Sequence, residues 1–440
     1  MKRFFLRSLI IITFFMLIGE LHGIKPKIII LTSRGGGGHM SAAQAISDAL
    51  MDKYNIEIVN PFTDVLVSID PVKKITFNRY AAEDLYNIFL RNHWNWLINR
   101  FFGDFGEYYV RTHRRRIKNC FEQFIKKNSP DLIISVVPYI NDVVLEVAEK
   151  FNLPFLIVPT DLDVSTFILG INYPKYKNFS IALAFDEPIL NKKFTANNVP
   201  KDKIQFIGYP LRSSFFSNNF NASGIKKDFH ITENKTVVMI LMGATGSSAI
   251  YKYITILAKC KLDIHLIICL GKNKEIEKKI NKIKFPTNIT RSVLGYTSRT
   301  AELMFISDVL ISKSGTATLS EAIQMNLPIF VDNTSVPLQW EKMSCDFIKE
   351  HKLGGIIKRF NHVNEMLEKL IKDTDSRDLI KSRMNKFKNE SFKKSIRLLI
   401  NDMFKKSNAK NNLLFFYTYS NLCKKIKSDG KERKIEAALG

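Results

Sequence analysis

Short apolar runs alternate along the chain with segments whose apolar residues recur at helical spacing. The first run, Ile28 to Leu31, is typical of a strand buried on both faces, and the segment behind it places Ala42, Ile46 and Ala49 on one face of a helix. Further strands are predicted in two series, at 57–62, 131–137, 154–163, 181–185 and 204–212, and then at 236–248, 262–271, 292–298, 308–323 (strand, loop and helix) and 327–333. This alternation predicts an α/β fold with two Rossmann-like domains that face each other across a cleft.

The domain boundaries follow changes in composition. We expect a first domain at 25–215, a polar linker at 216–235, a second domain at 236–403 and a basic, amphipathic or poorly ordered tail at 404–440. Residues 1–24 hold an uncharged run at 8–19, which is shorter than the ~20 residues that span a bilayer. A signal peptide and a retained membrane anchor both fit this segment.

The segment 77–124 interrupts the first series and mixes aromatic residues with arginines. It contains Trp94 and Trp96 and the run Arg114, Arg115 and Arg116. Rings beside cations are typical of a membrane interface with anionic lipids, but the same mixture serves single-stranded nucleic acid by stacking. A helical subdomain with a basic, solvated face is the third interpretation.

Composition adds an excess of positive charge. The 440 residues include 66 Lys+Arg against 42 Asp+Glu, which gives a net charge of +24. Such an excess indicates an anionic partner, although biased codon use in a lysine-rich chain explains part of it. The five cysteines are scattered without CxxC spacing, so we expect a reducing compartment and neither a zinc site nor a disulfide framework.

A run of four glycines, Gly35 to Gly38, connects the first predicted strand to its helix and ends at His39. Glycine lets backbone N–H groups approach a ligand at a helix N-terminus, and His39 is predicted to face the crevice above the strand ends. The spacing fits neither GxGxxG nor a P-loop. A tight turn with an incidental histidine is the plain alternative.

Two further loops of small residues follow strands in the second series. The first contains Gly243 to Gly246, and the second contains Ser314, Gly315 and Thr316 at the start of a predicted helix. Backbone amides at such a helix N-terminus are suited to hold a diphosphate.

These loops occur in a familiar order: GGGGH, ISVVPY, PTDL, GYPLR, LMGATG, LGYTS and KSGTATLSEA. The chain resembles the monogalactosyldiacylglycerol synthases and the bacterial diacylglycerol glucosyltransferases, and more distantly the N-acetylglucosaminyl transferase that makes lipid II. The resemblance extends from about Lys27 to Gly355. It implies the GT-B fold, a UDP-sugar donor held mainly by the C-terminal domain, and inverting transfer without a metal or other cofactor.

The resemblance also implies roles for individual donor-binding residues. Glu321 would contact the ribose, and the loop with Leu294 and Tyr296 would hold the uracil. Gln339 and Glu341 fall near the family's adjacent Gln-Glu pair, which contacts the sugar. Here the pair is interrupted as Gln339-Trp340-Glu341, and Ser344 stands where asparagine is usual. The full donor set is Gly243, Ala244, Thr245, Gly246, Leu294, Tyr296, Ser314, Gly315, Thr316, Thr318, Glu321, Gln339 and Glu341.

No DxD-like carboxylate pair adjoins the donor loops, and no His/Cys cluster has ligand spacing, so no catalytic metal is expected. His39 would take the proton of the attacking hydroxyl. Asp161 in PTDL would orient the acceptor or the base, unless it is only a carboxylate at a strand end. The residues expected at the acceptor and membrane are Gly36, Gly37, Gly38, Trp94, Trp96, Arg114, Arg115 and Arg116.

Three functions remain open on the sequence. The first is transfer of a hexose, galactose or glucose, from a UDP-sugar to diacylglycerol at a membrane surface, with anionic lipids as partners. The second is a UDP-N-acetylglucosamine-dependent transferase that acts on a polyprenyl-diphosphate lipid. The third is nucleic-acid binding, but the sequence contains no RNP-like, helix-turn-helix or zinc motif that would support it. The aromatic and basic segment favours the first. Because UDP-sugars are cytosolic, we expect a membrane-associated protein with its catalytic domains on the cytoplasmic face.

Overall fold

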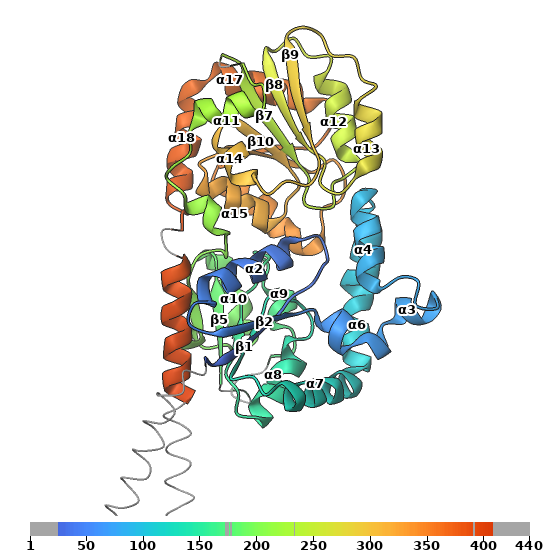
Figure 1. The fold of residues 1–440 in the computed structure, drawn as a ribbon, viewed down its shortest axis with the longest axis vertical. Coiled ribbons are helices and arrows are strands. Elements are labelled where there is room, and N and C mark those ends of the chain that lie inside the picture. The colour runs from blue at the N-terminus through green and yellow to red at the C-terminus, as the bar shows by residue number, and fades with distance from the viewer. Residues whose placement is uncertain (1–24, 172–175, 177, 233, 390–391, 408–440) are drawn as a thin grey trace, which may run out of the picture.

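The computed structural model of the protein describes residues 25–171, 176, 178–232, 234–389 and 392–407. The predicted signal or anchor segment at 1–24 and residues 408–440 of the predicted tail lie outside the described residues. Two parallel six-stranded sheets, each covered by helices, form the lower and upper halves of the molecule (Figure 1). Within the described part of the chain, no helix combines the length and apolar character needed to cross a membrane.

The first sheet has the strand order β2-β1-β3-β4-β5-β6. The apolar runs predicted as strands are buried on both faces because helices cover the sheet from both sides. The strands are β1 (Lys27–Leu31), β2 (Asn55–Val59), β3 (Leu132–Ser135), β4 (Phe155–Ile157), β5 (Phe179–Leu183) and β6 (Ile204–Phe206), and the main covering helices are α2 (Gly38–Leu50), α8 (Asn141–Lys150), α9 (Ser165–Ile168) and α10 (Pro188–Ala196).

The second sheet has the order β12-β11-β10-β7-β8-β9. Its strands are β7 (Thr236–Leu241), β8 (Ile264–Cys269), β9 (Ile289–Leu294), β10 (Val309–Ser312), β11 (Ile329–Asp332) and β12 (Gly354–Ile357). The edge strand β12 was not predicted, because it opens with two glycines. Its helices are α12 (Ala249–Leu257), α13 (Lys274–Ile280), α14 (Thr300–Phe305), α15 (Thr316–Gln324), α16 (Lys342–Glu350), α17 (His362–Lys372) and α18 (Thr374–Asn385).

The strand order of each sheet reverses at one point, between β1 and β3 in the first sheet and between β7 and β10 in the second. Ligands of doubly wound folds bind outside the carboxyl ends of the strands at such a point. The loop Gly35–Gly38 follows β1, and the loops after β7 and β10 carry Gly243 and Gly315. All three glycine-containing loops therefore lie where the topology favours a ligand.

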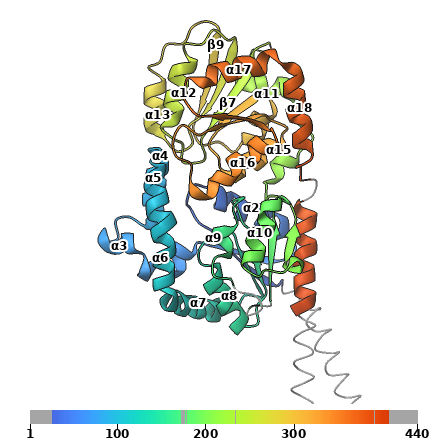
Figure 2. The ribbon, with the colours of Figure 1, turned by 180° about the vertical axis from the view of Figure 1, so that it is seen from behind.

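Between β2 and β3 the chain forms a helical insertion, residues 61–128, on one side of the first sheet (Figures 1 and 2). The insertion begins before residue 77, where the sequence placed its start. Its α-helices are α3 (Pro71–Ile75), α4 (Ala82–Arg91), α5 (Asn95–Ile98), α6 (Phe105–Thr112) and α7 (Arg114–Asn128). Helix α4 reaches the second domain, where the amide of Ser248 donates a 2.9 Å hydrogen bond to the carbonyl of Arg91.

Two segments pack differently from what their place in the sequence suggests. The expected linker at 216–235 contains α11 (Ala222–Asp228), and Ile225 and Ile231 are buried in the core of the second domain. Residues 392–407 are helical and return to the first domain, where Phe392, Ile396 and Ile400 are buried against its sheet. The span 236–403 therefore includes a helix that completes the core of the first domain.

Candidate active site

Two hollows of different character meet at the carboxyl ends of the first sheet. One is a cavity of about 880 Å³ between the helical insertion and the first sheet, and the other is a cleft of about 160 Å³ between the two domains. The residues that line both are Gly35, His39, Tyr86, Asp161 and Trp340. Two of the predicted residues, His39 and Asp161, are thus placed on the shared rim.

The glycine loops of the two domains are in contact across the cleft. Gly37 has a φ of 96°, and a Cβ at this position would lie 2.8 Å from the Cβ of Ala244. Only glycine satisfies both conditions, the left-handed backbone and the close approach. The run of glycines therefore brings α2 and the loop after β7 together and makes a narrow cleft.

His39 is held in one tautomer at the start of α2. Its Nδ1 lies 2.8 Å from the carbonyl oxygen of Val136 and 2.7 Å from Oγ1 of Thr160. Because a carbonyl oxygen only accepts, Nδ1 carries the proton, and Nε2 is the basic nitrogen. Burial and the nearby Lys313 lower the pKa of His39 to about 4, against the hydrogen bond to Val136. The imidazole is therefore neutral at pH 7 and ready to accept a proton.

Asp161 follows β4 and lies at the same rim. Burial, together with the charge of Glu341, raises the pKa of Asp161 to about 8, although Lys313 opposes the shift. Its neighbour in sequence, Asp163, accepts a 2.7 Å hydrogen bond from Nζ of Lys193 and is engaged in an ion pair instead. His39 is thus neutral and Asp161 protonated near pH 7, which makes His39 the better base of the two.

The opposite wall of the cleft is the N-terminal part of α15. Gly315, Thr316 and Thr318 line the cleft, and Glu321 lies one turn further along the helix. Burial raises the pKa of Glu321 to about 7 against the attraction of Arg212. Nη2 of Arg212, from the first domain, lies 3.4 Å from Oε1 of Glu321 and 2.5 Å from Oγ1 of Thr300.

An ion pair lies on the floor of the cleft. Nζ of Lys313 donates to Oε1 of Glu341 at 2.6 Å, and the hydroxyl of Ser314 donates to Oε2 at 3.0 Å. Both residues of the ion pair line the cleft, whereas Ser314 is buried behind them. Ser344, at the start of α16, is also buried, 3.1 Å from the hydroxyl of Thr316.

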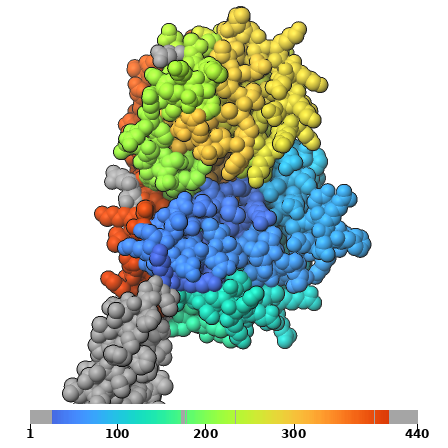
Figure 3. All heavy atoms as spheres, in the orientation of Figure 1, coloured from blue at the N-terminus to red at the C-terminus, as the bar shows by residue number. Residues whose placement is uncertain are grey.

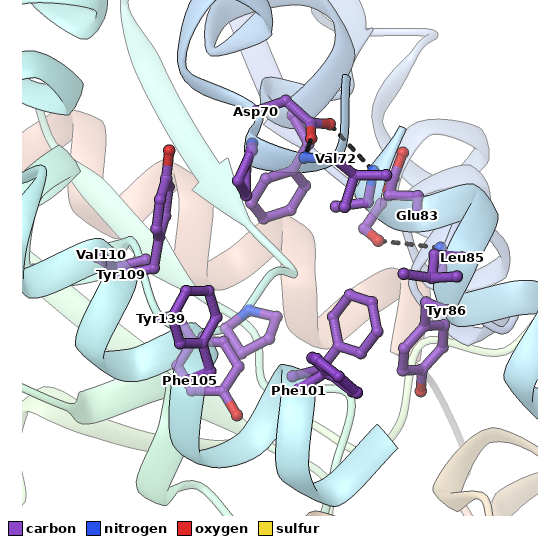
Figure 4. A pocket seen from close by; sticks show the side chains of 18 of the residues that line it. Asp70, Val72, Glu83, Leu85, Tyr86, Phe101, Phe105, Tyr109, Val110 and Tyr139 are labelled. Carbon is purple, nitrogen blue, oxygen red and sulfur yellow. Dashed lines mark hydrogen bonds between the residues drawn. The ribbon is translucent and has the colours of Figure 1, made fainter. Parts of the chain in front are cut away.

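The larger cavity is lined mainly by apolar and aromatic side chains. Tyr86, Phe101, Phe105, Tyr109 and Tyr139 surround it from several sides (Figure 4). Asp70 at its wall is satisfied by the protein, since its Oδ1 accepts hydrogen bonds from the first amides of α3. Such a hollow suits an apolar ligand that presents a polar group at the rim.

The structure brings most of the predicted donor residues to the cleft. Gly243, Ala244, Tyr296, Gly315, Thr316, Thr318, Glu321 and Glu341 line it, together with Gly36, Gly37 and Gly38. Four others are not among its lining residues: Thr245, Gly246, Leu294 and Ser314. Gln339 also lies outside the lining, because its backbone amide donates to Oδ1 of Asn99 at 3.0 Å and its side chain faces Asp104.

The residues predicted at the membrane have different environments. Trp94 and Trp96 are exposed and line neither hollow. Arg114 forms ion pairs with Asp142 and Glu146 of α8, so its charge is neutralised within the protein. Arg115 and Arg116 are exposed.

Sequence reasoning missed several residues of the site. Arg212 and Lys313 stood inside the motifs GYPLR and KSGTATLSEA, so their positions were available but no role was assigned to them. Tyr86 and Trp340 reach the rim only because the helical insertion and the loop before α16 fold toward it, whereas Tyr139, in the motif ISVVPY after β3, lines the larger cavity. An aromatic residue in a helical pattern carries no signal that separates a cavity wall from a core.

Sequence comparisons find two kinds of related protein. Residues 181–340 match the family of lipid-A-disaccharide synthetases. The processive diacylglycerol β-glucosyltransferase of Bacillus pumilus is 23% identical over 403 residues, which cover 88% of this chain and 97% of that enzyme. The enzyme of the same name from Bacillus cereus is 24% identical over 358 residues, 79% of this chain and 86% of that enzyme.

Solved structures of glycosyltransferases share the fold. MurG of Acinetobacter baumannii aligns with a TM-score of 0.55 at 11% identity over 86% of this chain and 99% of MurG. The calicheamicin glycosyltransferase CalG4 aligns with a TM-score of 0.56 at 11% identity over 87% of this chain and 99% of CalG4. The predicted fold class, two Rossmann-like domains of the GT-B type, is confirmed, and so is the distant relationship to diacylglycerol glucosyltransferases.

Proposed function

We propose that this chain, a glycosyltransferase of the GT-B fold, transfers glucose from UDP-glucose to the free hydroxyl of diacylglycerol. The observation that carries the proposal is the junction of the two hollows at His39. An apolar cavity of about 880 Å³ suits acyl chains, and a polar cleft of glycine loops suits a nucleotide-sugar. A hydroxyl at the head of a lipid in the cavity would arrive beside the histidine.

The reaction follows from the side chains at the rim. Nε2 of His39 takes the proton of the acceptor hydroxyl while its oxygen attacks C1 of the sugar, and the bond from C1 to the diphosphate breaks. Backbone amides at the start of α15 and in the loop after β7 face the leaving diphosphate, whose negative charge they stabilise. Direct attack of the acceptor oxygen on C1, with no covalent intermediate, is a single displacement, which inverts the configuration at C1.

The choice of glucose over galactose rests on the relatives, which are named β-glucosyltransferases. Glu341 lines the cleft at the site where the resemblance places the sugar. The competing acceptor is a polyprenyl diphosphate with N-acetylglucosamine as the sugar. Diacylglycerol is favoured over it because the relatives are named diacylglycerol β-glucosyltransferases.

The direct test is to incubate the purified full-length protein with UDP-glucose, UDP-galactose or UDP-N-acetylglucosamine, each with diacylglycerol or with a polyprenyl diphosphate. Mass analysis of the lipid products identifies both sugar and acceptor. We expect hexosyl-diacylglycerol from UDP-glucose. A product only on the polyprenyl diphosphate would replace the proposed acceptor, and no lipid product with any donor would refute the proposal.

We further propose that the mouth of the cavity docks on an anionic membrane. Ile75, Phe101, Phe105 and Tyr108 line the cavity and are also exposed, and Phe77 beside them is 93% exposed. The insertion that carries them projects from the side of the first domain (Figure 3). Lys74 and Arg79 flank these side chains and are exposed. This surface offers apolar insertion and positive charge around the entrance for a lipid.

Because Arg114 is paired with Asp142, we assign the contact with anionic lipid to the cations of the segment 73–80 instead. Arg115 and Arg116 are further exposed cations. Sedimentation of the full-length protein with vesicles tests it. Lys74→Gln with Arg79→Gln should weaken binding to anionic vesicles by about 1 kcal/mol for each charge and leave neutral vesicles unaffected. The matched control is Lys252→Gln with Arg291→Gln in the second domain. Equal losses in both pairs would contradict a docking surface at the cavity mouth.

We place the catalytic domains on the cytoplasmic face, because the proposed donor is cytosolic and the cavity mouth must meet a leaflet on that side.

A further inference from the structure

Lys313 occupies a central position in the cleft. It follows β10 directly, and its Cε lies 3.3 Å from where a Cβ of Gly243 would be and 3.4 Å from that of Gly315. The side chain therefore runs between the two loops of the second domain that are suited to a diphosphate. Its charge also lowers the pKa of both His39 and Asp161, which places it close to the reacting centre.

Among the residues described as lining the cleft, Lys313 and Arg212 carry the positive side chains, and Asp161, Glu321 and Glu341 carry carboxyl groups. Arg212 is already engaged with Glu321 and Thr300. A diphosphate that enters this cleft brings at least two negative charges, and burial makes unpaired charges costly. Lys313 is the cation placed to meet them.

In the structure, Lys313 is paired with Glu341. The carboxylate of Glu341 is buried, and its two oxygens accept hydrogen bonds from Lys313 and Ser314. The resemblance assigns this same glutamate to the sugar. A lysine bonded to Glu341 and a sugar hydroxyl bonded to Glu341 would compete for the same oxygen.

We propose that Lys313 exchanges partners when the donor binds: its ammonium group releases Oε1 of Glu341 and pairs with the diphosphate. This inference rests on the proposed function and adds a catalytic residue to it. Glu341, freed on one oxygen and still held by Ser314 on the other, accepts a hydrogen bond from a sugar hydroxyl. The lysine changes one anionic partner for another, so its own charge stays paired, while the carboxylate of Glu341 keeps the hydrogen bond from Ser314 and gains one from the sugar hydroxyl.

The exchange gives Lys313 a role in the chemical step. As the acceptor oxygen forms its bond to C1, the electron pair of the breaking C1–O bond moves to the diphosphate. The acceptor proton goes to Nε2 of His39 and then to solvent, and UDP leaves. Nζ of Lys313 remains protonated throughout and neutralises the charge that develops on the leaving oxygen.

Lys313→Met is the first test, with calorimetric binding of UDP and of uridine as separate measurements. UDP should bind at least tenfold more weakly, uridine within about twofold of the wild type, and kcat with UDP-glucose should fall by about 10²-fold or more. Lys252→Met is the matched control. Lys252 is a cation on α12 of the same domain, and its Nζ lies over the ring of Phe360. Unchanged UDP affinity and kcat in Lys313→Met would refute the role of the lysine.

Glu341→Gln tests the exchange itself. The lysine then has no carboxylate to leave, so UDP should bind as tightly as to the wild type or more tightly, while turnover falls because the sugar contact is weakened. A tenfold loss of UDP affinity in this variant would refute the exchange. Lys313→Arg keeps the cation and should retain most UDP affinity. If Lys313→Met does not fold, the UDP affinity of Lys313→Arg tests the role of the cation instead.

The two proposals fail separately. If the wild type makes no glycolipid but Lys313→Met loses affinity for UDP and not for uridine, the acceptor is wrong and the diphosphate contact stands. If the wild type makes glycolipid and Lys313→Met behaves like Lys252→Met, only the inference about Lys313 is wrong.

Discussion

The apolar cavity and the polar cleft meet at His39, yet the chain builds them by different means. The cleft is made of backbone, because loops at strand ends bring glycines such as Gly37 and Gly243 together at the point where each sheet reverses its order. The cavity is made of side chains that come from helices inserted between β2 and β3. The cleft selects its ligand by backbone amides and a few charged side chains. The cavity selects its ligand by its volume and apolar surface. Substitutions in the cleft should therefore change the affinity for UDP, and substitutions in the cavity should change the preference for the lipid.

The sharpest separation is expected from His39→Ala. Loss of a general base typically reduces the rate by ~10²–10⁴. UDP affinity should stay nearly unchanged, because the imidazole acts on the acceptor and not on the donor. Turnover numbers and calorimetry with UDP on the same preparation give both quantities. Near-wild-type turnover would remove His39 from the mechanism.

The same histidine predicts the acid limb of the pH profile. Its pKa is lowered to about 4, and the base must be unprotonated, so the active form predominates above about pH 4. The value of kcat/KM should therefore stay high well below pH 6.5, where an unperturbed histidine would already be half protonated. A midpoint near 6.5 in the wild type would mean that a group other than His39, such as Glu321 with its pKa of about 7, controls kcat/KM.

Glu321→Ala is the counterpart on the side of the cleft. A hydrogen bond to a charged group contributes roughly 1.5–3 kcal/mol, which corresponds to about a 10- to 150-fold loss of UDP affinity. The rate at saturating donor should fall much less, since the carboxylate contacts the ribose in ground state and transition state alike. Glu302→Ala on α14, whose carboxylate pairs with Arg299, is a control outside the cleft. Equal affinities for UDP in both variants would place the donor elsewhere.

The sequence was informative about these hollows to unequal degrees. Small residues at strand ends and the helix start at Thr316 recur in a fixed order, so the cleft could be predicted in outline. Eight of the thirteen predicted donor residues line it, whereas Arg212 and Lys313 were missed. The cavity could be predicted only as an aromatic and basic segment, because its lining depends on how α3 to α7 pack. Arg114 shows the limit: its charge looked available for lipid, but α8 supplies Asp142 and Glu146 to neutralise it. Ion-pair partners that lie far away in the sequence leave no signal in the local pattern of residues.

Filling the cavity should change the preference for acyl chains without changing UDP affinity. Val110 on α6 is half-buried and lines the cavity (Figure 4). Val110→Trp would displace about two methylene groups of a bound chain, at ~0.8 kcal/mol each, so kcat/KM for long-chain diacylglycerol should fall by about tenfold. Short-chain diacylglycerol should be affected less. Ile189→Trp, at an exposed position on α10, is the matched control. A uniform loss for all chain lengths would indicate damage to the fold instead.

The smallest effect concerns whether the two hollows act independently. Asn99, in the helical insertion, donates from Nδ2 to the carbonyl of Pro337 and accepts from the amide of Gln339, each at 3.0 Å. The loop it holds continues into Trp340, which lines both hollows, and Glu341, which lines the cleft. A lipid that orders the insertion should therefore also order this loop, and the donor should bind more tightly in its presence. Couplings between sites are typically 1–3 kcal/mol.

Asn99→Ala removes both hydrogen bonds and should reduce that coupling several-fold while it leaves the affinity for UDP alone within about twofold. The measurement is UDP affinity with and without a short-chain diacylglycerol, for the wild type and the variant. Asn92→Ala is the control, because Asn92 lies in the same insertion and, among the described residues, its side chain bonds within it, to the carbonyl of Ile88. If the wild type shows no effect of the lipid on UDP affinity, the contact between insertion and loop is structural, and the cavity and the cleft bind their ligands independently.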